Sequence, residues 1–242
     1  MIKIKIGGQT KKINEDIQIL NPNFNELNED NTDMYLDGEK VDFSKVIRGD
    51  GSIHEVIYET DQKFSTCKEM FKGSSEIISI DLQNINSDNV NDISFMFSGC
   101  KKLEKLNLFS LKTDKVVTME GVFTDCSSLA TLDLSSFKTN LVTSMSSLFE
   151  GCSRLDKVMV DNFDTGNVES MDSMFSGTSL KELDLRFFNL SSCKNYTNMF
   201  LNIPSFLSLA ITKTNYDLIA KEGDSGIEDI PGIKISQKIA VS

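Results

Sequence analysis

The 242-residue chain contains no tryptophan, three prolines and one histidine. With His54 alone, it cannot build a multi-histidine metal site, and no partners for a catalytic triad are visible in the sequence. The motifs G-x-x-x-x-G-K-[ST], H-E-x-x-H and G-x-S-x-G are missing, and residues 28–33 lack the central glycine of a calcium loop. We therefore predict no catalytic residue, no cofactor and no metal, and expect that the protein is not an enzyme.

Long apolar runs and a surplus of positive charge are missing as well. No apolar run approaches the roughly 20 residues that span a bilayer, and residues 1–8 alternate isoleucine with lysine, unlike a signal peptide. The net charge of −11 argues against nucleic acid, since phosphate binding needs concentrated Lys and Arg. We expect no membrane insertion, no nucleic-acid partner and a cytoplasmic location, or a cell-surface location if the chain is a fragment of a longer exported protein.

What the chain does contain is a repeat with a stride of 26 residues. The recurring phenylalanines are Phe71, Phe97, Phe123, Phe149 and Phe175, and Phe200 follows after 25 residues. Other apolar positions return at constant offsets from these phenylalanines, in the pattern L-x-x-L-x-L. Such regularity predicts units that stack on one another, each burying its apolar edge against the next.

Each unit has two halves with different periods. The end of L-x-x-L-x-L alternates with period two, which predicts a short strand. The following half has helical spacing, as in Val116, Met119, Val122 and Phe123, and we predict a short helix there. The threonines that precede these segments by three positions are candidate helix caps: Thr113, Thr139 and Thr165.

The composite unit F-x-G-C-x-x-L-x-x-L-x-L-x-x-F-x-T-x-x-V-x-x-M-x-x-M-F, nearly whole from Phe149 to Phe175, resembles the BspA-type leucine-rich repeat family of bacterial surface proteins and protist homologues. The resemblance covers roughly residues 64–211 and implies roles in adhesion or binding. The predicted fold is a leucine-rich-repeat solenoid of about six 26-residue strand-plus-short-helix units with a parallel sheet, preceded by a small β-rich cap. The predicted domains are residues 1–62 (cap), 63–211 (repeats) and 212–242 (C-terminal cap or tail).

Sulfur-containing side chains recur at the same position in successive units, and we call such a set of equivalent positions a column. Cys100, Cys126 and Cys152 occupy one column, in which Ser74 and Thr178 also stand. A small side chain therefore suffices there, and we predict buried free thiols, not disulfides or a metal site. Methionines likewise alternate with valine, leucine and isoleucine, so we assign them to the core.

The exposed strand face is the predicted partner-binding surface, because its side chains are free of core packing. The candidate residues are Asp81, Lys105, Asn107, Phe109, Asp133, Met159, Asp161, Asp184 and Arg186. Phe109 and Met159 interrupt otherwise polar columns and are candidate anchors. The alternative is that a terminal domain or a bent loop covers them.

Three functions are compatible with the sequence. We favour a non-catalytic scaffold that binds a protein partner through the strand face. The first alternative is a cell-surface adhesin module that recognises a host protein or a glycan, which the family resemblance implies. The second is a carboxylate-dependent hydrolase on the strand face, which we regard as the weakest because no catalytic motif accompanies the carboxylates.

Overall fold

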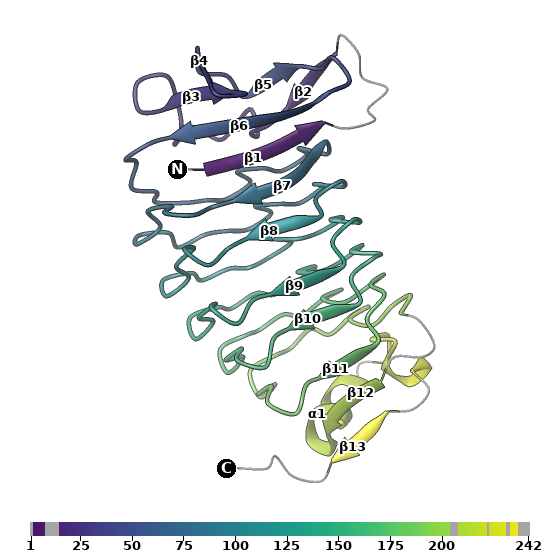
Figure 1. Cartoon of the computed structure of the whole chain (residues 1–242). Coiled ribbons are helices and arrows are strands. Elements are labelled where there is room, and N and C mark those ends of the chain that lie inside the picture. Colours follow the sequence, from purple (N-terminus) through teal and green to yellow (C-terminus); the bar gives the residue numbers. More distant parts are fainter. Residues whose placement is uncertain (1, 8–14, 204–207, 222, 231–232, 237–242) are drawn as a thin grey trace.

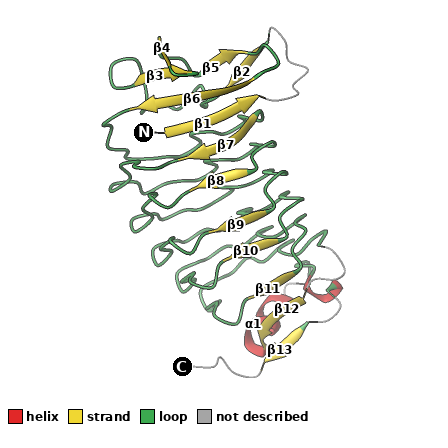
Figure 2. Cartoon of the chain, in the orientation of Figure 1, coloured by secondary structure: helices red, strands yellow, loops and turns green. Residues whose placement is uncertain are grey.

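The computed structural model describes residues 2–7, 15–203, 208–221, 223–230 and 233–236. Its segments stack along one direction, from the N-terminal strands at one end to α1 and β13 at the other (Figure 1). Strands and connecting loops make up almost all of the stack, and the helices of the described residues lie at the C-terminal end (Figure 2).

The N-terminal region is a set of short antiparallel strands. Its elements are β1 (Ile2–Gly7), β2 (Asp16–Gln18), β3 (Asp33–Leu36), β4 (Glu39–Val41), β5 (Val46–Arg48) and β6 (Ile53–Glu59). The β-rich character that the sequence predicts for residues 1–62 is seen in these six strands. Asp37 and Gly38 both have positive φ and form the turn that joins β3 to β4.

β1 connects this region to the first repeat. It pairs antiparallel with β6 on one side and with β7 (Ile77–Asp81) on the other. A six-stranded sheet results, in the order β4-β3-β6-β1-β7-β8. The loop after β2 covers the other side of the first repeat, where the Asn21 amide donates to the Met70 carbonyl at 2.9 Å and Ser74 Oγ donates to the Ile19 carbonyl at 3.0 Å. The domain boundary at residue 62 stays a prediction.

The repeat phenylalanines form one continuous stack in the core. From Phe71 to Phe200, neighbouring ring centroids lie 5.6 to 5.9 Å apart, and the ring planes differ by 4 to 19°. All six side chains are buried. Equal offsets in the sequence therefore correspond to neighbours in space, which fixes how every other column is placed.

One short strand per repeat lies on one side of the stack, which we call the strand side. These strands are β7, β8 (Lys105–Asn107), β9 (Thr131–Asp133), β10 (Lys157–Met159), β11 (Glu182–Asp184) and β12 (Ser208–Thr212). Parallel ladders join β7 to β8, β9 to β10 and β11 to β12, while no ladder joins β8 to β9 or β10 to β11 in the described part of the chain.

The opposite side, which we call the turn side, is hydrogen-bonded without interruption. Parallel bridges run from Asp92 through Thr118, Ser144 and Ser170 to Asn195. Amides of one repeat donate to carbonyls of the next, as Phe97 does to Val122 at 2.9 Å and Phe123 to Leu148 at 3.1 Å. Backbone bonding between repeats therefore holds this side together more completely than the strand side.

The predicted solenoid of strand-plus-short-helix units with one parallel sheet is wrong. The residues with helical spacing form turns, and no helix occurs within the described residues 64–203. The cause is a pair of left-handed residues in each unit, which interrupts a right-handed helix. They are Glu69/Gly73, Phe95/Gly99, Gly121/Asp125, Ser147/Gly151, Ser173/Gly177 and Asn198/Asn202. The strands, moreover, belong to separate small sheets and not to one parallel sheet.

The predicted helix caps are wrong for the same reason. Thr113 Oγ1 donates to the carbonyl of Lys138 at 3.0 Å and accepts from its amide at 2.7 Å, so it connects two repeats. Thr139 and Thr165 donate in the same way to the carbonyls of Asp164 and Asn189. These buried hydroxyls replace a helix cap with a bond between units.

The sulfur-containing columns lie in the core, as predicted. All five cysteines are free, and Cys100, Cys126 and Cys152 are fully buried. Each of these three thiols donates to the carbonyl of a repeat phenylalanine, such as Cys126 to Phe97 at 3.1 Å. Burial raises the pKa of all three thiols, that of Cys152 to about 12, so they stay protonated and unreactive near neutral pH.

The C-terminal region continues the stack for one more layer. It contains α1 (Lys213–Ala220), the 3-10 helix η1 (Ile227–Asp229) and β13 (Lys234–Ser236), which pairs parallel with β12. Asn215 Nδ2 donates to the carbonyls of Leu185 and Phe188. The carbonyl of Ser225 accepts from the Phe200 amide at 2.8 Å and so extends the turn-side bonding. Within the predicted segment 212–242, residues 222, 231–232 and 237–242 lie outside the described residues, and its limits stay a prediction.

Candidate interaction surface

The predicted column of polar residues on the strand side has a structural role that the sequence analysis missed. Carboxylate or amide oxygens in this column accept from the backbone amide two residues later: Asp81 from Gln83, Asn107 from Phe109, Asp133 from Ser135, and Asp184 from Arg186. Such bonds stabilise the turn that follows each strand. The Ser135 side chain, and then the Ser135 amide, hold the pKa of Asp133 below its usual range, and the Arg186 side chain is the main cause of the same shift for Asp184.

Met159 is the exception in this column. A thioether does not accept the turn bond as the carboxylate or amide oxygens of the other units do, and the Met159 side chain is 39 % exposed. The turn chemistry that explains its column neighbours therefore does not explain this side chain. Phe109, the other predicted anchor, is 85 % exposed. Neither residue is covered by a described terminal segment or loop, so the alternative of a covering element is wrong for the described part of the chain.

A groove opens on the strand side at β10, β11 and β12, with a cavity volume of about 540 Å³. We call it the β10–β12 groove. Its lining residues are Lys157, Val158, Met159, Val160, Asp161, Glu182, Leu183, Asp184, Phe187, Ser208, Ala210 and Lys234. Among the described residues no ladder joins β10 to β11, and the outward positions of β12 carry the small side chains Ser208 and Ala210. Missing strand pairing and missing side-chain bulk together produce the hollow.

The walls of the groove combine apolar and charged groups. Met159 and Phe187, which is 52 % exposed, supply the large apolar side chains. Asp184 is occupied by Arg186, whose Nη2 lies 2.6 Å from Asp184 Oδ2. Among the described residues, Lys157, Asp161, Glu182 and Lys234 form no ion pair with one another or with any other side chain. Their charges are therefore free to meet charges of a ligand.

The groove brings together only part of the predicted set. Met159, Asp161 and Asp184 line it, and Arg186 lies beside it on Asp184. Asp81, Lys105, Asn107 and Phe109 belong to the region of β7 and β8, and Asp133 to β9, outside the lining. The sequence analysis missed Phe187, although an aromatic residue in a column otherwise filled by Ser110, Ser136 and Asn162 was a usable signal.

The repeats match one family model. The model, described as "Mycoplasma protein of unknown function, DUF285", matches residues 65–159 and 128–221, which together cover more than half of the chain. The chain belongs to the DUF285 family. It matches no curated protein and no solved structure. Within the described part of this DUF285 protein, none of the helices has the length and apolar character needed to cross a bilayer.

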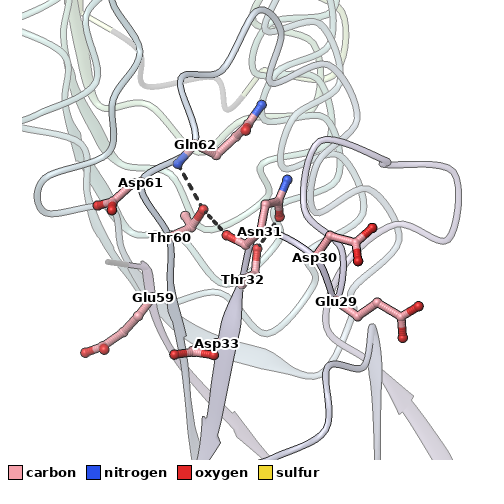
Figure 3. A pocket seen from close by; sticks show the side chains of 9 residues that line it. All are labelled: Glu29, Asp30, Asn31, Thr32, Asp33, Glu59, Thr60, Asp61 and Gln62. Carbon is pink, nitrogen blue, oxygen red and sulfur yellow. Dashed lines mark hydrogen bonds between the residues drawn. The ribbon is translucent and has the colours of Figure 1, made fainter.

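A second hollow of this DUF285 protein, of about 660 Å³, lies in the N-terminal region (Figure 3). It is lined by Glu29, Asp30, Asn31, Thr32, Asp33, Glu59, Thr60, Asp61 and Gln62. Thr60 Oγ1 donates to the Asn31 carbonyl at 2.7 Å and accepts from the Gln62 amide at 3.0 Å. No three carboxylate, thiol or imidazole groups among the described residues are placed to hold one metal ion. Acidic character alone assigns no ligand to this hollow.

Proposed function

We propose that this DUF285 protein is a non-catalytic interaction scaffold, and that its β10–β12 groove receives an extended segment of a protein partner. The observation that carries this proposal is the joint exposure of Met159 and Phe187 in one hollow. Large apolar side chains at the centre of a concave patch are the usual energetic centre of a protein interface. Methionine also adapts its shape to different partner side chains.

The lining favours a polypeptide segment of mixed character. An apolar side chain of the partner would lie between Met159 and Phe187, above Ala210. Lys157 and Lys234 would meet carboxylates of the partner, and Asp161 and Glu182 its cations. Phe109 extends the surface, because its position in the repeat is that of Asp161 two units earlier.

The finer family relationship is part of the proposal. We infer that the repeats are of the BspA type, which the composite unit at residues 149–175 supports. Within that family an adhesin module is the alternative function, and its ligand would be a host protein or a glycan. Two large exposed apolar side chains in the groove favour a protein over a glycan, because a glycan presents mainly hydroxyl groups, whereas a protein segment can supply apolar side chains to contact them.

A peptide selection tests the proposal. The whole chain is immobilised, a displayed library of random 12-residue peptides is selected on it, and the affinity of the enriched peptides is measured by fluorescence anisotropy. We expect the Met159→Ala/Phe187→Ala variant to bind at least about 30-fold more weakly, the loss expected for residues at the centre of an interface.

The matched control removes two comparably exposed apolar side chains on the turn side, Val117→Ala/Leu141→Ala, and should leave the affinity unchanged. If the enriched peptides bind the groove variant as well as the native chain, the groove is not the binding site. If selection yields no peptide while a glycan array gives a signal that the groove variant loses, the protein-binding proposal is wrong and the adhesin alternative replaces it.

A further inference from the structure

The only histidine of the chain lies between two carboxylates in the N-terminal sheet. His54, on β6, has Nδ1 2.7 Å from Asp37 Oδ2 and Nε2 3.0 Å from Asp50 Oδ1. The imidazole is mostly buried, with 13 % of its side chain exposed, while the two carboxylates are about half exposed. Both ring nitrogens thus have an acidic partner at hydrogen-bond distance.

This arrangement favours the doubly protonated ring when both carboxylates are ionised. An ionised carboxylate can only accept hydrogen bonds, and a neutral imidazole has a single N–H to donate. Both contacts can form together only when both nitrogens carry a proton, as in the imidazolium. With both carboxylates ionised, the two contacts therefore form together only around a positively charged His54.

The three residues join three separate segments. Asp37 lies in the turn between β3 and β4, Asp50 in the loop between β5 and β6, and His54 on β6 itself. Asp37 is further fixed by its Oδ1, which accepts from the Glu55 amide at 2.8 Å. Asp50 Oδ1 also accepts from the Ser52 amide at 2.7 Å. The Gly49 amide donates separately to the Glu15 carbonyl at 3.0 Å, so loss of the His54 contacts would release residues 50–52 from the β3–β4 turn.

We propose that Asp37, His54 and Asp50 form a proton-controlled clamp that ties residues 50–52 to the β3–β4 turn when His54 is protonated and releases them when His54 loses its proton. Deprotonation leaves the ring with one N–H for two acceptors and removes the cation that separates two carboxylates. Repulsion between Asp37 and Asp50 then favours the open loop. This inference does not depend on the β10–β12 groove, and its test is separate.

No other charged side chain competes for the ring among the described groups. On β6 the nearest acid is Glu55, and on β4 it is Glu39; neither forms an ion pair with His54. On β1, the residue paired with His54 in the strand register is the uncharged Ile6. On β3, the last residue in the register with β6 is the uncharged Leu36, which pairs with Val56. The charge state of the clamp therefore follows from Asp37, His54 and Asp50.

The sign of the pH dependence follows from the pKa shifts of the three groups. Hydrogen bonding to Asp37, opposed by partial burial and supported by Asp50, raises the pKa of His54 above its ordinary 6.5. The bond to His54 and then the bond to the Glu55 amide lower the pKa of Asp37 below 3.8, and the bond to the Ser52 amide and then that to His54 lower the pKa of Asp50. The clamp thus contributes fully between about pH 4 and pH 6.5. Its contribution is lost as pH rises through the folded-state pKa of His54, or as pH falls through those of the aspartates.

Nuclear magnetic resonance of the whole chain tests the clamp directly, since one histidine gives one set of imidazole signals. We expect the His54 ring to titrate above pH 6.5, and the amide signals of Gly51 and Ser52 to move with the same midpoint. Asp50→Asn and Asp37→Asn should each lower that midpoint. Asparagine retains an acceptor oxygen for the backbone bonds and tolerates the left-handed backbone of Asp37, so the fold is kept.

The matched control is Asp16→Asn, which removes an exposed carboxylate of the same region that pairs with Arg48 and does not contact His54. It should leave the His54 midpoint unchanged. A His54 midpoint at or below 6.5 in the native chain would overturn the proposal. So would a midpoint that Asp50→Asn does not lower, or amide signals of residues 51 and 52 that fail to follow the ring titration.

Discussion

Phe123 shows what a single residue contributes to this fold. Its ring lies between those of Phe97 and Phe149, at centroid distances of 5.6 and 5.9 Å, and it is fully buried. Phe109 is the opposite case, since most of its surface meets solvent. The same residue type thus packs the core in one column and contributes an exposed contact in another.

These two phenylalanines give a matched pair of substitutions. We expect Phe123→Ala to lower the free energy of unfolding by about 3 to 5 kcal/mol, because it leaves a cavity between two rings. Phe109→Ala should change it by no more than about 0.5 kcal/mol, since little packing is lost. Chemical denaturation of both variants measures the difference. Equal losses would show that Phe123 is not enclosed by its neighbours.

For single residues, the sequence predicted which side chains are buried better than it predicted the shape of the exposed surface. The buried phenylalanines, cysteines and methionines follow from constant offsets, since only buried positions are restricted to apolar residues. The β10–β12 groove could not be predicted. It depends on where strand pairing is lost between β10 and β11 and on small side chains of β12, and neither follows from the repeat pattern.

At the scale of elements, the second half of each repeat has the apolar spacing of a helix but the backbone of a series of turns. The spacing of Val142, Met145, Leu148 and Phe149 fits a helical face, but the backbone turns twice through the left-handed region at Ser147 and Gly151. Apolar spacing of three or four residues indicates which side chains face the core. It does not indicate whether successive residues are bonded within their own segment or to the next one, and here the bonds go to the next repeat.

The left-handed position at Ser147 supports a stabilising substitution. In the preceding repeat Gly121 occupies this position. A residue with a Cβ costs about 1 to 2 kcal/mol there, and glycine costs about 0.5 to 1 kcal/mol in chain entropy. We therefore expect Ser147→Gly to raise the free energy of unfolding by about 0.5 to 1 kcal/mol. Its control, Ser98→Gly, lies at a position without positive φ and should lower it. Thermal unfolding of both variants measures the two changes in the free energy of unfolding. A lower free energy of unfolding in both variants would contradict the left-handed backbone at Ser147.

At the scale of the whole molecule, the two sides of the stack differ in continuity. The turn side has bridges from Asp92 to Asn195, whereas the strand side is divided among separate small sheets. The turn side can therefore maintain the stack while the strand side opens into the β10–β12 groove. Segments before and after the repeats extend the backbone bonding at both ends, through residues 19–21 and through residues 224–225.

The most direct test of this account is a double-mutant cycle on the phenylalanine stack, measured as free energies of unfolding. The variants are Phe97→Leu and Phe123→Leu, singly and together, with Phe97→Leu and Phe175→Leu as the control pair. Phe97 and Phe123 are stacked neighbours, and we predict a coupling energy of about 0.5 to 1.5 kcal/mol. Two rings separate Phe97 from Phe175, so that pair should be additive within about 0.5 kcal/mol. Additivity for the neighbouring pair would contradict the stack and, with it, the columns from which the binding surface is built.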